Sequence, residues 1–107
     1  MMAIRLASAI LFAGIALVPA AAQETGDVRQ GRVLARDVCA ACHAVEAETP
    51  TSPARQAPSF VALARTPGMT EMALNAALHT SHRTMPNLVL TVPEARNVIA
   101  YILSLKP

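Results

Sequence analysis

The sequence predicts a small all-α domain, and three observations lead to that prediction. Two segments, residues 28–39 and 91–105, carry apolar residues at helical spacing. The first segment follows Asp27 and the second begins with Thr91, and both residue types commonly cap the start of a helix. No segment shows the apolar and polar alternation typical of a half-buried strand, and there is no internal repeat. With 107 residues, the chain has room for one domain at most.

The first predicted helix covers residues 28–39 and begins after Asp27, a good N-cap. Its apolar face is formed by Val28, Gly31, Leu34, Ala35 and Val38. A glycine inside a helix costs about 0.5–1 kcal/mol relative to alanine, so a packing reason is expected. We therefore expect another part of the chain to pack closely against Gly31.

A loop and two short helices are predicted next. Residues 49–58 hold three prolines and no periodicity, which indicates a surface loop around a pocket. A short helix is expected over Phe60–Ala64, ending at a turn formed by residues 66–68. Another helix is expected to begin after Thr70 and to end near residues 79–82. Its apolar residues should face the pocket, and they are Leu74, Ala77 and Leu78.

The last predicted helix begins at Thr91. Thr91 and Glu94 have the spacing of a capping box, and Pro93 stands in the first turn. An apolar stripe at helical spacing follows, formed by Val98, Tyr101, Ile102 and Leu105. This stripe predicts that one face of the helix is buried against the rest of the domain.

The first 22 residues have the pattern of a secretory signal. A basic start that includes Arg5 is followed by an apolar run, Leu6–Val18, and by Pro19–Ala22. We predict cleavage after residue 22, which leaves a mature domain of residues 23–107 in the periplasm. The apolar run is shorter than the roughly 20 residues that cross a bilayer. An uncleaved membrane tether is the alternative to cleavage.

The charge and composition of the mature domain exclude one class of function. Residues 23–107 carry eight Lys or Arg and seven Asp or Glu, a net charge of +1, with no basic run. These features exclude a nucleic-acid-binding surface. The whole chain has only two Phe, one Tyr and no Trp, so a domain this small needs a disulfide, a metal or a cofactor to complete its centre.

The two cysteines define the candidate site. Cys39 and Cys42 are three residues apart and His43 follows directly, which is the C-x-x-C-H signature of covalent haem attachment. On one helical turn the two thiols project to the same side, where they can react with the two vinyl groups of one porphyrin. The adjacent imidazole can then reach the iron. The motif therefore predicts one haem c, attached through Cys39 and Cys42, with His43 as an iron ligand.

Three other uses of the cysteines are possible. A disulfide is the ordinary state of two cysteines in an exported protein. A thioredoxin-like redox site needs a βαβ setting, and no strand pattern precedes the motif. A structural zinc site needs four ligands, and the possible set is Cys39, Cys42, His43 and either His79 or His82. The complete motif in an exported chain favours covalent haem over all three.

With this motif the chain resembles the class I cytochromes c, in particular the short monohaem bacterial members, over about residues 31–105. In that family the haem motif ends an N-terminal helix, a proline-containing loop follows, and a methionine beside a proline precedes a C-terminal helix. The matching segments here are Gly31–His43, Ala57–Phe60, Met85-Pro86 and Thr91–Leu105. The resemblance implies a cytochrome c fold of three to four short helices around one covalently attached haem, with the first and last helices crossing.

Met85 is predicted to be the second iron ligand, since electron-carrying cytochromes c pair methionine with histidine. Its loop can cross to the far side of a porphyrin, and the following proline restricts it to an extended conformation. Met69 and Met72 flank a helix start and are expected to fill gaps in the core or to lie on the surface. The alternatives to Met85 are His82 and then His79, each of which also suits a helix C-terminus.

The resemblance also implies a partner for His43. A ligating histidine nearly always donates its other ring N–H to a carbonyl or carboxylate, and the family pattern assigns that role to the backbone carbonyl of Pro58. Two departures from the family pattern concern the surroundings of the cofactor. No Trp is present to hold a haem propionate, and Ala35 stands where many relatives carry an aromatic residue.

The predicted ligands lead to a predicted function. An iron with protein ligands on both sides has no vacant position for a substrate, so it exchanges electrons and does little bond chemistry. We therefore expect an electron carrier, not an enzyme, that docks transiently with redox partner proteins such as an upstream dehydrogenase or a downstream oxidase. The alternatives are a haem enzyme or gas sensor with a displaceable Met85, and a disulfide or zinc protein without haem.

Overall fold

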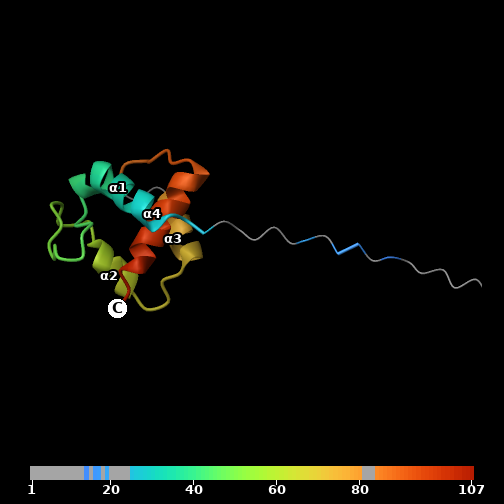
Figure 1. The fold of residues 1–107 in the computed structure, drawn as a ribbon. Coiled ribbons are helices and arrows are strands. Elements are labelled where there is room, and N and C mark those ends of the chain that lie inside the picture. Colours follow the sequence, from blue (N-terminus) through green and yellow to red (C-terminus); the bar gives the residue numbers. More distant parts are fainter. Residues whose placement is uncertain (1–13, 15, 18, 20–24, 81–83) are drawn as a thin grey trace, which may run out of the picture.

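The structure is a computed structural model that describes residues 14, 16–17, 19, 25–80 and 84–107. The cleavage site predicted after Ala22 and the alternative ligand His82 lie outside the described residues. In the described part of the chain the regular elements are all helical, as predicted (Figure 1). They are α1 (Val28–Asp37), a 3-10 turn (Cys39–Ala41), α2 (Phe60–Arg65), α3 (Glu71–His79) and α4 (Val92–Ser104).

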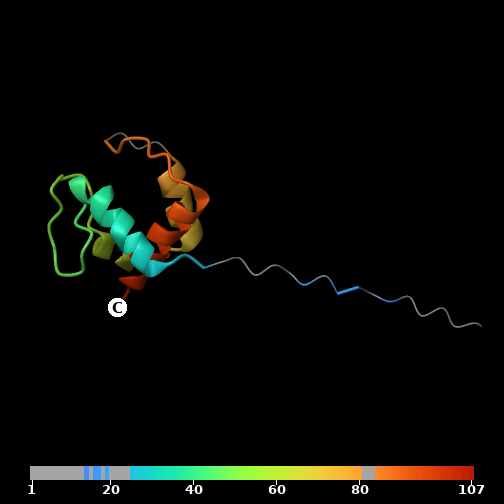
Figure 2. The same cartoon turned by 45° about the horizontal axis from the view of Figure 1, so that its top comes forward.

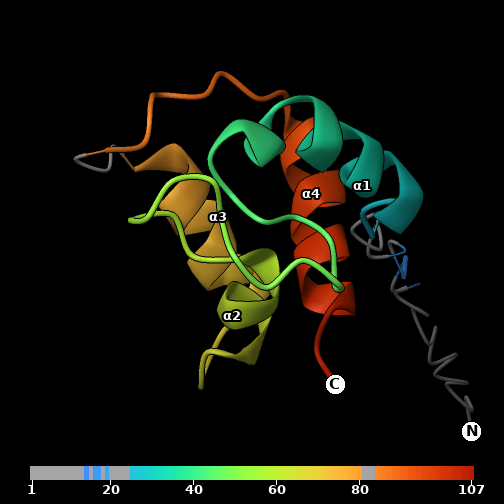
Figure 3. The ribbon, with the colours of Figure 1, turned by 90° about the vertical axis from the view of Figure 1, so that its left-hand side faces the viewer.

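The other helices pack around α4. It contacts α1, α2 and α3, and α1 lies across one end of it, as the views in Figures 2 and 3 show. The buried residues of α4 are Ala95, Val98, Ile99, Tyr101 and Ile102. They form one core with Ala35, Val45, Phe60, Ala64 and Leu74 from the rest of the domain. The predicted stripe is therefore buried, with Leu105 partly buried at its end.

Gly31 marks the place where α1 and α4 meet. A Cβ atom added to Gly31 would lie 1.9 Å from the backbone oxygen of Asn97 and 2.9 Å from the Cβ atom of Tyr101. Nearby, the backbone N–H of Asp27 donates a hydrogen bond of 2.8 Å to the Asn97 side chain. The prediction of a close approach at Gly31 is confirmed, because any side chain there would displace the backbone of α4.

Short polar side chains cap the described α-helices. The capping residues are Asp27, Ser59, Thr70 and Thr91. At α4, Thr91 and Glu94 form both hydrogen bonds of the predicted capping box. Ser59 is the one cap of these four that sequence reasoning missed. No described helix has the length and apolar character needed to cross a membrane.

The end of α1 differs from the prediction. The helix stops at Asp37, two residues early, because the chain tightens into the 3-10 turn that carries the first cysteine. Val28 and Val38, expected on the buried face, are 42% and 39% exposed. The buried face of α1 is narrower than predicted and consists of Gly31 and Ala35.

The turn between α2 and α3 lies where it was expected. The backbone N–H of Met69 donates to the carbonyl of Thr66 at 3.1 Å, which closes the turn. Gly68 has a φ of 76°, a conformation that glycine adopts without steric cost. Proline before this glycine is the usual combination for a type II turn. The turn directs the chain from α2 back into α3.

Candidate functional site

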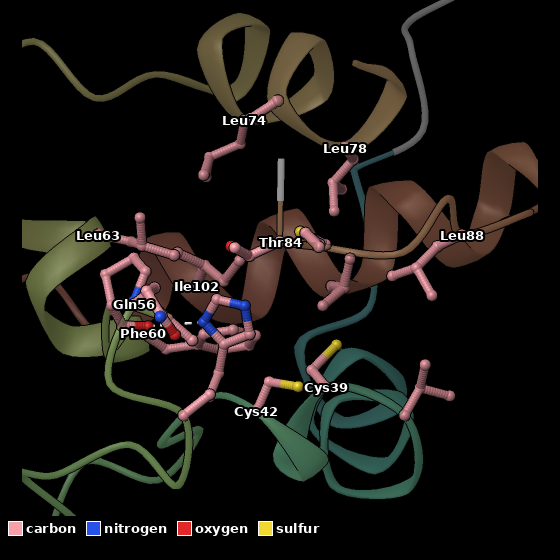
Figure 4. Close-up of a pocket in the computed structure, with 18 of the residues that line it drawn as sticks. Cys39, Cys42, Gln56, Phe60, Leu63, Leu74, Leu78, Thr84, Leu88 and Ile102 are labelled. Atoms are coloured by element: carbon pink, nitrogen blue, oxygen red, sulfur yellow. Dashed lines mark hydrogen bonds between the residues drawn. The ribbon is translucent and has the colours of Figure 1, made fainter. Parts of the chain in front are cut away.

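The described residues surround a cavity of about 280 Å³, near the lower end of the range typical of small-molecule sites. One wall is formed by the C-x-x-C-H motif and residues 54–58, and the opposite wall by α3 and residues 84–88. Figure 4 shows Leu74 and Leu78 pointing from α3 into the space above Cys39 and Cys42. The loop and the apolar face of α3 therefore border the pocket as predicted.

Cys39 and Cys42 lie at the two ends of the 3-10 turn as free, half-buried thiols. The turn is closed by a hydrogen bond of 3.1 Å from the backbone N–H of Cys42 to the carbonyl of Cys39. Both side chains line the cavity, and Figure 4 shows them on the same side of it. Burial raises the pKa of the Cys39 thiol, which keeps it protonated at neutral pH.

His43 lines the cavity beside the two thiols. Its ring nitrogen Nδ1 lies 2.6 Å from the backbone carbonyl oxygen of Pro58. Since a carbonyl only accepts hydrogen bonds, Nδ1 is the donor, and in the neutral imidazole Nε2 is then the nitrogen with the free lone pair. The ring of Phe60 packs against the imidazole with a centroid distance of 5.6 Å. The hydrogen bond that the family resemblance implied is thus present, and it leaves Nε2 free to bind a metal.

The segment that follows His43 is tied to two helices. The Tyr101 hydroxyl of α4 donates to the carbonyl of Val45 at 2.6 Å. Arg32 of α1 donates to the Glu46 carboxylate at 2.8 Å, and Arg36 also pairs with it. The hydrogen bonds from Arg36 and Arg32 lower the pKa of Glu46. These contacts hold the backbone of residues 45–46, which directly follow His43, against α1 and α4.

Sequence reasoning did not single out Glu46. Its partners lie 10 and 14 positions earlier in the chain, which is outside the spacing that places side chains together on one helix. The side chains of Arg32, Arg36 and Glu46 meet only because the chain after the 3-10 turn folds back along α1. No signal in the sequence alone identifies this cluster.

The methionines and histidines occupy different surroundings. Met85 is half-buried and lines the cavity, as does Met69. Met72, in contrast, is 82% exposed. His79 is exposed at the end of α3 and does not line this cavity. Its Nδ1 lies 2.7 Å from the carbonyl of Asn75, one turn earlier.

The described members of the possible zinc set do not form a metal-binding group. Within residues 25–80 and 84–107, no three His, Cys, Asp or Glu side chains lie close enough together to hold a metal ion. Cys39, Cys42, His43 and His79 are all among these residues. His82, the remaining alternative, lies outside the described residues.

The residues around the cavity fit the haem that the motif predicts. The donor set consists of two free thiols, the His43 imidazole and the thioethers of Met69 and Met85, all lining one space. Apart from these groups, the described lining is apolar except for Gln56 and Thr84. A flat, largely apolar macrocycle suits such walls, and the thiols, imidazole and thioether are the groups that c-type haem proteins use.

Comparison with known proteins supports this assignment. Over 99 residues the chain is 36% identical to cytochrome c-552 of Bradyrhizobium diazoefficiens, an alignment that covers 88% of this chain and 94% of that protein. No protein-family model matches the chain. No solved structure matches it either.

Proposed function

This chain belongs to the class I cytochrome c family, and on that basis we propose that it is an exported carrier of single electrons with one covalently attached haem. One observation supports the proposal above all others. Two free thiols and the His43 imidazole line one wall of the cavity, Met85 lines another, and most of the other lining residues are apolar. A haem bound there supplies an iron atom that stores one electron at a time.

Cys39 and Cys42 would hold the haem through thioether bonds. Each bond forms when a thiol S–H adds across a vinyl double bond, with the sulfur on one carbon and the hydrogen on the other. This addition needs no oxidant, and it requires thiols rather than a disulfide. Both cysteines are free and face the cavity, which supports this role.

His43 would bind the iron through Nε2. The 2.6 Å hydrogen bond to the Pro58 carbonyl fixes the tautomer and the orientation of the ring. Donation of the Nδ1 proton also increases the basicity of Nε2. Pro58 therefore acts on the iron indirectly, through the imidazole.

Met85 would bind the iron from the other side. Its half-buried thioether lines the same cavity as the imidazole, whereas the exposed His79 does not. Methionine opposite histidine raises the reduction potential. If His43 and Met85 both bind the iron, no ligand position is left for a substrate, which supports a carrier and not an enzyme.

The apolar lining supports the same function. Leu74 and Leu78 cover one wall, and Val98 and Ile102 belong to the buried core of α4. These side chains keep water from the iron and lower the local dielectric constant. In a low dielectric the reduced state, which has less net charge at the iron, is favoured, so the lining also raises the potential.

Features of the sequence support the proposed location and kind of partner. The signal pattern of residues 1–22 supports export to the periplasm, followed by cleavage. The partners would be redox proteins, an upstream dehydrogenase or a downstream oxidase. Because the mature charge of +1 is small, docking should be weak and transient, with a modest dependence on salt.

The proposal is tested by expressing the full chain with its signal in a host that matures c-type cytochromes. Haem should remain with the protein after extraction with acidic acetone, because thioether bonds survive where iron ligation does not. The periplasmic fraction should show a reduced-minus-oxidised difference spectrum of a low-spin cytochrome c. Replacing both cysteines, Cys39→Ala and Cys42→Ala, should release the haem into the solvent. Haem lost from the unaltered protein would contradict covalent attachment.

A further inference from the structure

The loop between the C-x-x-C-H motif and α2 turns back (Figure 2) and is bonded to the motif on both sides of the histidine. On one side of His43, the backbone N–H of Ala54 donates to the carbonyl of Cys42 at 3.1 Å. On the other side, the backbone N–H of Ala44 donates to the Ser52 hydroxyl at 2.9 Å. Each residue that flanks the histidine is therefore tied to the loop by a hydrogen bond.

Ser52 has a different role from the other hydroxyls that accept from a backbone N–H. Those in the described part of the chain cap helices, and they are Ser59, Thr70 and Thr91. Ala44, in contrast, is only 3% exposed, and no other described group accepts from its N–H. A buried N–H without a partner is costly. Pro53, which directly follows, restricts Ser52 to an extended conformation and so limits where its hydroxyl can lie.

The same loop provides the acceptor for the imidazole. The carbonyl oxygen of Pro58 lies 2.6 Å from Nδ1 of His43. Two positions later, the backbone N–H of Phe60 donates to the carbonyl of Ala44 at 2.9 Å. Ala44 is thus bonded through its N–H to Ser52 and through its carbonyl to Phe60, and Pro58 lies between these two attachments in the chain. The distance from the imidazole to its acceptor therefore depends on both attachments.

We infer that Ser52 is a positioning residue for the iron ligand His43. By accepting from Ala44, its hydroxyl holds the loop against the motif and keeps the Pro58 carbonyl at hydrogen-bond distance from Nδ1. The inference rests on the proposed function and extends it to a residue that does not line the cavity. A firm hydrogen bond at Nδ1 increases the basicity of Nε2, which favours ferric iron. Ser52 therefore lowers the reduction potential, and it does so through His43.

The inference is tested by potentiometric titration of the holoprotein with Ser52→Ala, which removes the hydroxyl, and Ser52→Thr, which keeps it. Thr51→Ala is the matched control, because Thr51 is exposed in the same loop and its hydroxyl has no hydrogen-bond partner among the described residues. Ser52→Ala should favour reduction about two- to fivefold, which is a rise of about 20–40 mV at 59 mV per tenfold for one electron. The potentials of Ser52→Thr and Thr51→Ala should stay at that of the unaltered protein.

Hydrogen exchange in the reduced, ¹⁵N-labelled protein separates positioning from a general loss of stability. In Ser52→Ala, the Ala44 amide and the Nδ1–H of His43 should exchange about tenfold faster, while the buried Ile99 amide of α4 keeps its rate. Haem retention in acidic acetone is recorded for every variant, which tests the proposed function separately. With haem retained, the inference would be overturned if Ser52→Ala matched Thr51→Ala in potential and in exchange at His43. An equal rise in potential in Ser52→Ala and Ser52→Thr would also overturn it, because the hydroxyl would then not be the cause.

Discussion

At the scale of single residues, the arrangement around His43 decides the chemistry of the site. The ring nitrogen Nδ1 donates a hydrogen bond of 2.6 Å to the Pro58 carbonyl. The other ring nitrogen, Nε2, is therefore available to bind a metal. The imidazole also packs against Phe60, and the ring of Phe60 packs against Tyr101 with a centroid distance of 6.2 Å. The orientation of the imidazole is thus set by two neighbours, Pro58 and Phe60.

Met85→Ala should lower the reduction potential and open the iron to exogenous ligands. In the proposed site the thioether would bind the iron and raise the potential, and alanine can do neither. The ferrous variant should bind carbon monoxide stoichiometrically at neutral pH, whereas the unaltered protein should bind it poorly. Absorption spectra under carbon monoxide and potentiometric titration check both effects.

Met72→Ala is the matched control for Met85→Ala. Met72 is 82% exposed and does not line the cavity, so its loss should change neither spectrum nor potential. An unchanged spectrum in Met85→Ala would assign the sixth position to another residue. Stoichiometric carbon monoxide binding by the unaltered protein would instead favour a sensor or an enzyme.

At the scale of elements, the crossing of α1 and α4 holds the two ends of the domain together. At Gly31 the two backbones are so close that an added Cβ atom would lie 1.9 Å from the Asn97 oxygen. Gly26 has a similar position, with an added Cβ atom 2.1 Å from the Arg96 oxygen. Both glycines approach backbone, which cannot move aside as a flexible side chain can.

Gly31→Ala should destabilise the protein by about 2–3 kcal/mol, because the new methyl group overpacks the crossing. The higher helix propensity of alanine would offset only part of this cost. Chemical denaturation of the holoprotein measures the free energy of unfolding. Val33→Ala, on the exposed face of the same helix, serves as the control, since Val33 is 53% exposed. If the two variants were equally stable, the crossing would be looser than the structure indicates.

At the scale of the whole molecule, the region after the haem motif connects the two terminal helices. Glu46 pairs with Arg32 and Arg36 of α1, while Tyr101 of α4 donates to the neighbouring carbonyl of Val45. A change in the charge of Glu46 therefore affects the contact between α1 and the site.

Acid should destabilise the fold through this cluster. Its two arginines hold the pKa of Glu46 below the ordinary value of 4.5. A carboxylate with a lowered pKa in the folded state stabilises the fold above its unfolded pKa, and this stabilisation is lost as pH falls through the folded pKa. The melting temperature should therefore decrease below about pH 4.5. Glu46→Gln should melt a few degrees lower at neutral pH and depend less on pH in acid.

The control for Glu46→Gln is Glu48→Gln, which removes an exposed carboxylate that forms no hydrogen bond or ion pair with a described residue and has only the weakest of the electrostatic interactions that raise the pKa of Arg32. Its melting curve should follow that of the unaltered protein at each pH. Thermal unfolding followed by circular dichroism between about pH 3 and 7 covers the relevant range. An acid dependence of Glu46→Gln identical to that of the unaltered protein would rule out this cluster as its source.

Export also belongs to the scale of the whole molecule. The mature protein purified from the periplasm should begin at Gln23, because the Ala20–Ala22 sequence has the pattern of a small-residue cleavage site. Intact-mass spectrometry of the holoprotein, with one haem added, measures the N-terminus. Retention of Met1 would show that the apolar segment is an uncleaved tether.

The sequence by itself determined the local features of this protein. The C-x-x-C-H spacing, the caps at Asp27, Thr70 and Thr91, and the turn before Met69 all depend on residues within four positions of one another. The order of residues settles such features, because the chain between them is too short to adopt many arrangements. The apolar stripe of α4 was also predictable, since helical spacing determines which residues share a face.

Only the tertiary structure decided which distant groups meet. In the structure Glu46 pairs with two arginines of α1, and Met69 and Gln56 line the cavity. Val28 is 42% exposed, although helical spacing had predicted that its side of α1 would be buried. Helical spacing gives the direction of a side chain, but burial depends on where a second element covers it. The part of α1 that α4 covers depends on the angle and the position at which the two helices cross. Contacts between residues far apart in the chain determine both.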